Sequence, residues 1–290
     1  MKLHTVNTEL FKLDGGAMFG VVPKSIWNKF NPADENNMCS WAMRCMLIED
    51  NGRLVLIDNG IGDKQDAKFF SYYFLHGEDT LEKSLNNLGF TKADITDVIL
   101  THLHFDHCGG SIDRVNGTLV PAFKNAIYWS NELHWKWATE PNDREKASFL
   151  KENILPIQQH GQLQFIAQPA TALQSTGLLP SVAFNENISI LFVNGHTGMM
   201  MLPQINYNGK TIVFVADLLP AVDHLPVPYV MAYDMFPLTS MHEKKSFLAE
   251  AVENDYVLFF EHDPINECCT LKQTEKGVRR QECFQLSAIS

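Results

Sequence analysis

The stretch His102-Leu103-His104-Phe105-Asp106-His107 decides the fold of this chain. It gathers imidazoles and a carboxylate directly after the apolar run Val98-Ile99-Leu100-Thr101. If that run is a buried strand, the polar side chains emerge from its C-terminal end, where they can converge on divalent cations. Gly109 and Gly110 then let the backbone turn tightly away. The stretch therefore predicts a metal site at a strand end.

The same arrangement recurs elsewhere in the chain, because single acidic or imidazole residues follow other apolar runs. These residues are Asp58 after Leu54–Ile57, His196 after Ile188–Val193, Asp217 after Ile212–Val215, and His262 after Val257–Phe260. Ligands from the ends of several strands can meet above one sheet edge, as they do in open α/β architectures. We expect these residues to contribute to the metal site.

Strand and helix signals alternate along the sequence, which predicts an α/β or α+β fold. The predicted strands are 41–48, 54–57, 97–100, 126–129, 188–193, 211–215 and 256–260. Asp50-Asn51-Gly52 follows the first of them as a hairpin turn. Three helices are predicted. The first begins after Thr80 and is ended by Gly89, the second begins after Ser130, and the third spans 239–254. No repeat or linker divides the chain, so residues 1–290 are expected to form a single domain.

Composition excludes several classes of function. The net charge of −11 opposes binding to nucleic acid and favours a small-molecule partner. No apolar run of about 18 residues or more indicates a membrane span, and the N-terminus lacks a signal peptide, so we expect a cytoplasmic protein. The six cysteines contain no CxxC pair, and free thiols are the expected state.

The HxHxDH stretch, followed in order by a histidine, an aspartate and another histidine after strands, resembles the metallo-β-lactamase superfamily. Ile57-Asp58-Asn59-Gly60-Ile61-Gly62 is similar to the DxGxG element of that superfamily. The resemblance covers the chain from about Cys45 to His262. It implies a four-layer αββα sandwich, with two facing sheets flanked by helices and two metals at one edge.

The resemblance also implies the ligand assignment. His102, His104 and His196 would hold the first metal. The second would be held by Asp106, His107 and His262, and Asp217 would bridge the two. Asp58 would orient the ligands from behind. Zinc is the expected metal, with manganese, iron and cobalt as alternatives.

Such a dinuclear site implies a hydrolase that uses a metal-bridging hydroxide. Asp106 and Asp217 are the expected catalytic carboxylates, and Asp106 is also a candidate proton donor to the leaving oxygen. The presence of Asp217 where some β-lactamases carry a cysteine argues against β-lactam substrates.

Two segments narrow the substrate class. Asp14–Pro23 and Ala216–Asp234 are similar to quorum-quenching N-acyl-homoserine-lactone lactonases and to methyl-parathion-hydrolase-like enzymes. The sequence departs from these relatives at Met200, where a second histidine is common, and at Pro220, where lactonases often carry a tyrosine. A lactone or related ester is the expected substrate. Activity on phosphotriesters or phosphodiesters is the alternative, and a di-iron redox protein or a non-catalytic binding module is less favoured.

Substrate contacts are predicted from the same segments. Met18, Phe19, Tyr229 and Tyr233 are the expected lining of a substrate pocket, with either tyrosine as a hydroxyl donor. Either an apolar pocket or a homodimer interface fits Phe30 and the tryptophans Trp27, Trp135 and Trp137. His224 is not assigned as a ligand, although it lies close to Asp217 in the sequence.

Overall fold

The computed structural model describes residues 1–168 and 177–289 of the chain. The chain forms two compact units, and each is built from two separate segments. Residues 1–10 and 43–167 form the first unit, and residues 11–42 and 168–290 form the second. This division into compact units does not test the expectation that residues 1–290 form a single domain, which stays a prediction.

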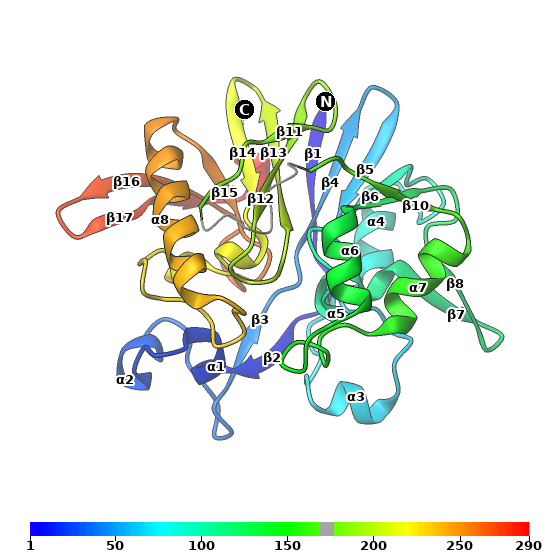
Figure 1. The fold of residues 1–290 in the computed structure, drawn as a ribbon, viewed down its shortest axis with the longest axis horizontal. Coiled ribbons are helices and arrows are strands. Elements are labelled where there is room, and N and C mark those ends of the chain that lie inside the picture. The colour runs from blue at the N-terminus through cyan, green and yellow to red at the C-terminus, as the bar shows by residue number, and fades with distance from the viewer. Residues whose placement is uncertain (169–176, 290) are drawn as a thin grey trace. The chain divides into compact units, whose positions relative to one another are not determined.

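The first unit is organised around a six-stranded sheet (Figure 1). Its strands, in spatial order, are β1 (Lys2–Val6), β4 (Cys45–Asp50), β5 (Arg53–Ile57), β6 (Asp97–Ile99), β9 (Ile127–Ser130) and β10 (Leu163–Phe165). A two-residue turn, Asn51-Gly52, joins β4 to β5 with positive φ at both positions, as the sequence predicted. The four strands β5, β6, β9 and β10 run parallel, so their carboxyl ends share one edge.

Short helices and a hairpin complete the first unit. They are α3 (Ala67–Ser71), α4 (Leu81–Asn87), α5 (Phe105–Cys108), α6 (Glu132–Thr139), α7 (Lys151–Gln159) and the 3₁₀ turn η1 (Gly109–Ser111), with the hairpin β7 (Ile112–Val115) and β8 (Thr118–Pro121). One apolar cluster joins the sheet to these helices through Leu56, Val98, Leu85 and Ile154. Removing these side chains from water anchors the helices, because burial of an aliphatic side chain contributes about 1.5–3 kcal/mol.

The second unit contains a seven-stranded sheet. Its strands, in spatial order, are β11 (Val182–Ala183), β12 (Ile188–Val193), β13 (Met200–Tyr207), β14 (Lys210–Phe214), β15 (Val257–Phe259), β16 (Cys268–Thr274) and β17 (Gly277–Phe284). The pairing along the sheet makes β12, β14 and β15 point the same way, because β13 runs against both β12 and β14 while β14 and β15 are parallel. Three carboxyl ends therefore lie at one edge of this sheet.

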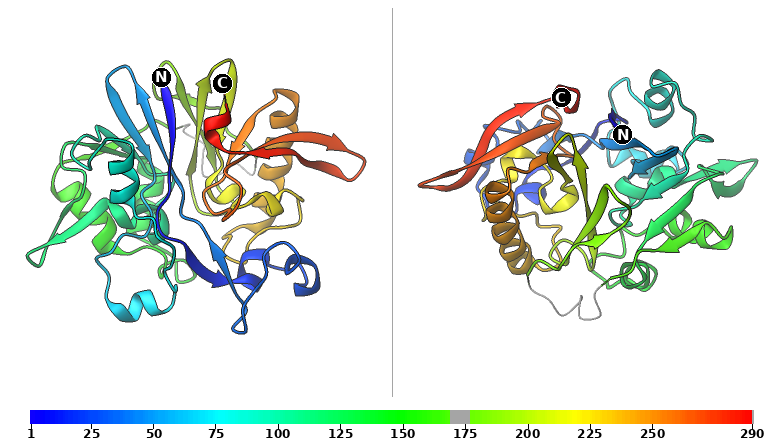
Figure 2. Two further views of the ribbon diagram at one scale, coloured as in Figure 1. Left: turned by 180° about the vertical axis from the view of Figure 1, so that it is seen from behind. Right: turned by 90° about the horizontal axis from the view of Figure 1, so that it is seen from above.

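The remaining elements of the second unit are a small sheet and several helices. They are β2 (Phe11–Asp14), β3 (Met38–Trp41), α1 (Gly15–Phe19), α2 (Lys24–Trp27), α8 (Pro237–Glu253) and the 3₁₀ turns η3 (Ala216–Leu218), η4 (Val222–His224) and η5 (Leu286–Ala288). Helix α8 packs against β16 and β17 (Figure 1). Figure 2 shows the β16–β17 hairpin from behind and from above, extending away from the other strands of its sheet.

Most predicted strands are confirmed, but the expected strand 41–48 is wrong. Strand β3 ends at Trp41 and β4 begins at Cys45, so the run contains parts of two strands in different units. Between them, Ala42 donates its N–H to the carbonyl of His262, and the Met43 carbonyl accepts from Thr8. The whole stretch is buried, and hydrophobicity alone does not distinguish one continuous buried strand from two.

The helix starts are also confirmed, two of them with small shifts. Thr80 caps α4 by accepting from Lys83 N–H, and Gly89 follows its end with a positive φ. Helix α6 is capped by Asn131 rather than Ser130, and its side chain accepts from His134 N–H. Helix α8 starts at Pro237, two residues before the predicted start, because proline fits the first helical position.

Two further features concern the helices and the cysteines. Among the described residues, no helix has the length and apolar content that crossing a bilayer requires. No cysteine forms a disulfide within residues 1–168 and 177–289. The cytoplasmic location itself stays a prediction.

The glycines after the HxHxDH stretch are required by close backbone approach. A Cβ at Gly109 would lie 2.0 Å from the carbonyl oxygen of Ile61, and one at Gly110 would lie 2.2 Å from that of Asn59. Gly110 also donates its N–H to the carbonyl of Gly60. The HxHxDH loop is thus held directly against the loop that follows β5.

We expect Gly109→Ala to lower the free energy of unfolding by about 1–3 kcal/mol, because the loop must shift to admit the methyl group. Urea titration followed by circular dichroism measures this change. Gly177→Ala is the matched control, since its nearest neighbours lie 3.5 Å away on a side chain. Equal stability of the two variants would show that the loop accommodates the added carbon.

Candidate metal centre

The first unit places His102 and His104 so that two ring nitrogens face each other. His102 Nε2 and His104 Nδ1 are 3.0 Å apart, and both residues are buried. Ligands around one zinc ion, each about 2.0–2.1 Å from it, are separated by similar distances. The two imidazoles are therefore spaced as ligands of a common cation would be.

The other nitrogen of His102 is held by a hydrogen-bond chain. The Thr101 hydroxyl donates its single proton to Asp58 Oδ2 at 2.6 Å, so it accepts from His102 Nδ1 at 3.1 Å. The Thr101 N–H also donates to Asp58 Oδ1. Because Asp58 follows β5 and Thr101 follows the parallel strand β6, the sheet itself brings these groups together.

Asp58 also orients His107. Its Oδ2 accepts from His107 Nδ1 at 3.2 Å, which directs His107 Nε2 toward Asp106 Oδ2 at 3.8 Å. Asp58 is fully buried and has a positive φ of 55°. Such backbone strain in a non-glycine residue often marks a functional position. Asp58 thus contacts both Thr101 and His107, and its role in orienting metal ligands stays a prediction.

His104 is oriented by Glu145, which the sequence analysis did not identify. His104 Nε2 donates to Glu145 Oε1 at 3.0 Å, and the carboxylate also accepts from Trp137 Nε1 at 2.7 Å. Glu145 is 1% exposed. A buried carboxylate behind a histidine increases the basicity of the nitrogen on the other side of the ring.

His134 holds the loop itself in place. Its Nε2 accepts the N–H of Leu103, between the two histidines, at 2.9 Å. Lys64 is buried beneath the same loop and donates to the carbonyl of Gly109. Burial lowers the pKa of Lys64 to about 8. Both contacts restrain the backbone that carries the candidate ligands.

The second unit holds its own cluster at the shared edge of β12, β14 and β15. His196 Nε2 lies 3.0 Å from Asp217 Oδ2, and His262 Nε2 lies 3.0 Å from Asp217 Oδ1. Each oxygen of the carboxylate therefore faces a different imidazole. A carboxylate placed in this way is suited to bridge two cations.

The two histidines of this cluster are also fixed on their far sides. His196 Nδ1 donates to Asp234 Oδ1 at 2.9 Å, and His262 Nδ1 donates to the carbonyl of Ala42 at 2.7 Å. Burial would lower the pKa of His196, but the carboxylates of Asp217 and Asp234 raise it to about 10. Both carboxylates therefore favour the protonated form of the ring.

These contacts test whether a metal fits the candidate ligands. Every candidate histidine has one nitrogen held by an oxygen of the same unit, and its other nitrogen faces another candidate ligand. That pattern is the usual environment of metal-binding imidazoles, because it fixes both the ring orientation and the tautomer. The imidazole and carboxylate donors suit zinc, and they also suit manganese, iron or cobalt.

Helix α8 positions the loop that carries His196. The carboxylate of Glu243 accepts the N–H groups of Asn194 at 2.7 Å and Gly195 at 2.9 Å. A Cβ at Gly195 would lie 2.3 Å from Ser240 on the same helix, so only glycine fits. Glu243 is fully buried, and burial raises its pKa to about 7.

The predicted substrate-pocket residues have mixed environments. Met18 and Phe19 are buried, and Phe19 stacks on His224 with ring centroids 4.6 Å apart. Tyr229 accepts from Lys244 Nζ through its carbonyl, while Tyr233 is 37% exposed. Their contact with substrate stays a prediction.

His224 is not a member of either cluster. Its Nε2 donates to the carbonyl of Met18 at 2.9 Å, and burial lowers its pKa to about 3. The ring therefore stays neutral and packs between Phe19 and Trp41. This environment agrees with leaving His224 unassigned as a ligand.

An aromatic group next to Asp106 was also missed by the sequence analysis. Phe105 packs against Tyr73, with ring centroids 4.7 Å apart, and against Phe69 at 5.4 Å. Burial and the nearby Asp106 raise the pKa of Tyr73 to about 12, so its phenol keeps its proton. The only sequence signal for this group was the aromatic cluster Phe69-Phe70 and Tyr72-Tyr73-Phe74, far from the histidines.

The fold and the two clusters agree with the family comparison. A model of the metallo-beta-lactamase superfamily matches residues 44–262. The chain therefore belongs to the metallo-beta-lactamase superfamily and has its mixed α/β fold. The matched range contains all seven candidate ligands.

Curated relatives include lactonases. An N-acyl homoserine lactonase of Bacillus cereus is 28% identical over 142 residues, which cover 46% of this chain and 50% of the relative. A similar lactonase of Bacillus thuringiensis is 25% identical over 142 residues, with the same coverage. The chain thus spans about half the length of the curated relatives it matches.

Solved structures share the fold over nearly the whole chain. A probable metal-dependent hydrolase from Staphylococcus aureus has a TM-score of 0.86 and 26% identity, and the match covers 100% of this chain and 98% of that one. AidC, a dizinc quorum-quenching lactonase in complex with a product, has a TM-score of 0.76 and 20% identity, with 98% and 95% covered.

We expect Glu145→Ala to weaken zinc binding by roughly 10–100-fold, because His104 loses the carboxylate that orients it. Glu145→Gln keeps an acceptor without its charge and should weaken binding less. Competition with a chromogenic chelator measures the affinity, and circular dichroism checks the fold. Glu140→Ala, at an exposed carboxylate nearby, is the control. Unchanged affinity in Glu145→Ala would mean that the contact does not tune the ligand.

We expect Glu243→Ala to destabilise the protein by about 2–5 kcal/mol, because two buried N–H groups lose their acceptors. Glu243→Gln retains one acceptor oxygen and should recover part of this loss. Urea unfolding measures stability, and elemental analysis measures metal content. Glu253→Ala, at an exposed site on α8, is the matched control. If Glu243→Ala were as stable as Glu253→Ala, the His196 loop would not depend on the two hydrogen bonds to Glu243.

Proposed function

We propose that this chain is a dinuclear-metal hydrolase whose substrate is a lactone, an N-acyl-homoserine lactone or a related ester. The observation that supports it most directly is the orientation of the five candidate histidines. In each, an oxygen holds one nitrogen and the other nitrogen faces a candidate ligand. Such an arrangement has little value to a protein that binds no cation.

The proposed ligand set is the one that the family resemblance implies. His102, His104 and His196 hold one metal, Asp106, His107 and His262 hold the other, and Asp217 bridges them. Two cations, when bound, would polarise the substrate carbonyl and lower the pKa of a water molecule toward neutrality. Zinc is the proposed metal.

The chain's own residues supply positioning and proton transfer. Asp217 faces two imidazoles at 3.0 Å and holds them at a fixed spacing. Asp106 lies in the first turn of the short helix α5 and is 9% exposed, and we assign its carboxyl the transfer of a proton to a leaving oxygen. Asp106 and Asp217 are therefore the proposed catalytic carboxylates.

The substrate class rests on the relatives. The curated relatives are named as N-acyl homoserine lactonases, and AidC holds the product of lactone opening. A lactone is a neutral small molecule, which suits a protein of net charge −11. The proposed substrate contacts are Met18, Phe19, Tyr229 and Tyr233. The proposed biological role is quorum quenching in the cytoplasm, by a monomer or a homodimer.

Metal analysis and a substrate panel test this proposal together. We expect about two metal ions per chain, and hydrolysis of acyl-homoserine lactones that stops when a chelator removes them. The panel also contains aryl phosphotriesters, phosphodiesters and acyl thioesters. Asp217→Ala should lower kcat/KM for the lactone by at least about 100-fold, since both imidazoles lose their partner.

Asp143→Ala, at a fully exposed carboxylate, is the control and should behave as the parent protein. Selective cleavage of phosphotriesters or phosphodiesters would replace the lactone by the alternative substrate class. A protein that contains iron with a di-iron optical spectrum and that hydrolyses no ester would favour the redox alternative. Protein without bound metal, prepared without chelator, would contradict the proposal altogether.

A further inference from the structure

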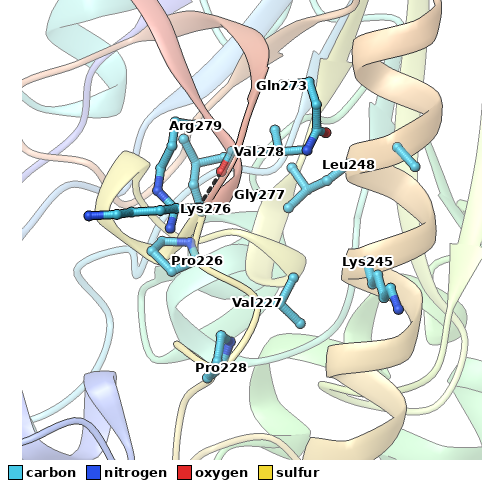
Figure 3. Close-up of a pocket in the computed structure, with 12 residues that line it drawn as sticks. Pro226, Val227, Pro228, Lys245, Leu248, Gln273, Lys276, Gly277, Val278 and Arg279 are labelled. Carbon is cyan, nitrogen blue, oxygen red and sulfur yellow. Dashed lines mark hydrogen bonds between the residues drawn. The ribbon is translucent and has the colours of Figure 1, made fainter.

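A groove in the second unit is lined by residues other than the candidate ligands. It is bounded by residues 225–228, by helix α8 and by the β16–β17 hairpin (Figure 3). Its volume is about 460 Å³. Sites for small molecules usually have volumes of roughly 300–1,000 Å³. The groove is therefore large enough for a small amphipathic molecule.

The middle of the groove is apolar. Figure 3 shows Val227 and Leu248 between the hairpin and the helix, with Val278 above them and Pro226 and Pro228 on the wall. An alkyl chain laid along this surface would leave water and would cover the partly exposed Val227 and Val278, next to the buried Leu248. Each methylene buried in this way favours binding by up to about fourfold.

The edge of the groove is cationic. Lys245 on α8, Lys276 in the hairpin turn and Arg279 on β17 all line it. Within residues 1–168 and 177–289, none of the three pairs with a carboxylate. Arg279 Nη1 donates to the neighbouring carbonyl of Val278 at 2.7 Å, which folds the side chain back toward its own strand. Three cationic side chains thus line one groove of a chain whose net charge is −11.

We propose that this groove binds an amphipathic carboxylate, that is, an acyl chain that ends in one negative charge. The apolar middle fits the chain, and the cationic edge fits the carboxylate, which guanidinium and ammonium groups bind through charge-assisted hydrogen bonds. A phosphate-rich ligand would leave the apolar surface exposed, and a neutral lipid would leave the cations uncompensated. Binding here does not depend on the proposed hydrolase activity.

The groove shares its walls with elements that support the candidate metal cluster of the same unit. Helix α8 provides Lys245 and Leu248 to the groove and, two residues before Lys245, Glu243 to the His196 loop. Lys244, between them, donates to the carbonyl of Tyr229, directly after the wall residue Pro228. A bound carboxylate would therefore restrain the same helix that holds His196.

Calorimetric titration of the purified full-length protein with decanoate, below its micellar concentration, tests the proposal. We expect saturable binding to one site that weakens at high salt. Decanol, which lacks the charge, and acetate, which lacks the chain, should each bind at least tenfold more weakly. Absence of saturable decanoate binding would overturn the proposal.

Two groove variants and one control variant locate the bound decanoate. Ala249→Trp fills the groove from an exposed position on α8, and Lys245→Ala with Arg279→Ala removes two of the cations. Both should weaken decanoate binding at least tenfold. Lys272→Ala, an exposed lysine on β16 outside the groove, should not change it.

Asp217→Ala distinguishes the groove from the candidate metal centre. Decanoate that occupies the groove should bind this variant as it binds the parent protein. If Asp217→Ala abolishes binding while Ala249→Trp leaves it unchanged, the carboxylate binds at the metals and the groove proposal fails. A photoreactive decanoate analogue should label peptides from residues 225–228, 245–249 and 273–279, and labelling elsewhere alone would contradict the assignment.

Discussion

An imidazole can offer one nitrogen to a cation only when the ring is held in the right orientation and its proton is kept on the other nitrogen. This constraint organises much of the structure. Asp58, Glu145 and Asp234 are buried carboxylates whose described contacts hold the rings of His107, His104 and His196. A buried carboxylate is costly unless it is paired, and each of these three accepts a hydrogen bond from its histidine.

The sheets provide the frame for these contacts. Asp58 and Thr101 meet because β5 and β6 are parallel, and Asp217 faces His262 because β14 and β15 are parallel. Carboxyl ends of parallel strands lie at a common edge, so residues distant in sequence converge there. The backbone of each loop is then held by a buried side chain, His134 in the first unit and Glu243 in the second.

The candidate ligands stand out in the sequence because core packing alone rarely requires several histidines directly after an apolar strand. Strand β12 and the turn at Asn51-Gly52 were predicted correctly, since their signals are local. Glu145 and Glu243 were not identified, because a single glutamate in a polar stretch or a helix looks like any exposed acid. Their burial depends on tertiary packing, which has no local pattern. Strand β13 and the β16–β17 hairpin were missed for a related reason, because their sequences mix polar and apolar residues without strict alternation.

The interleaving of the two units affects how the chain can fold during synthesis. Residues 11–42 belong with residues 168–290, although the ribosome makes 125 residues of the other unit between them (43–167). The early segment, which contains the buried Trp27 and Trp41, must wait for its partner strands while apolar side chains are still uncovered. Neither unit is one continuous stretch of the gene. A fragment that ends at residue 168 would therefore contain residues 11–42 of the second unit without the rest of that unit. Production of either half alone would therefore favour aggregation over folding.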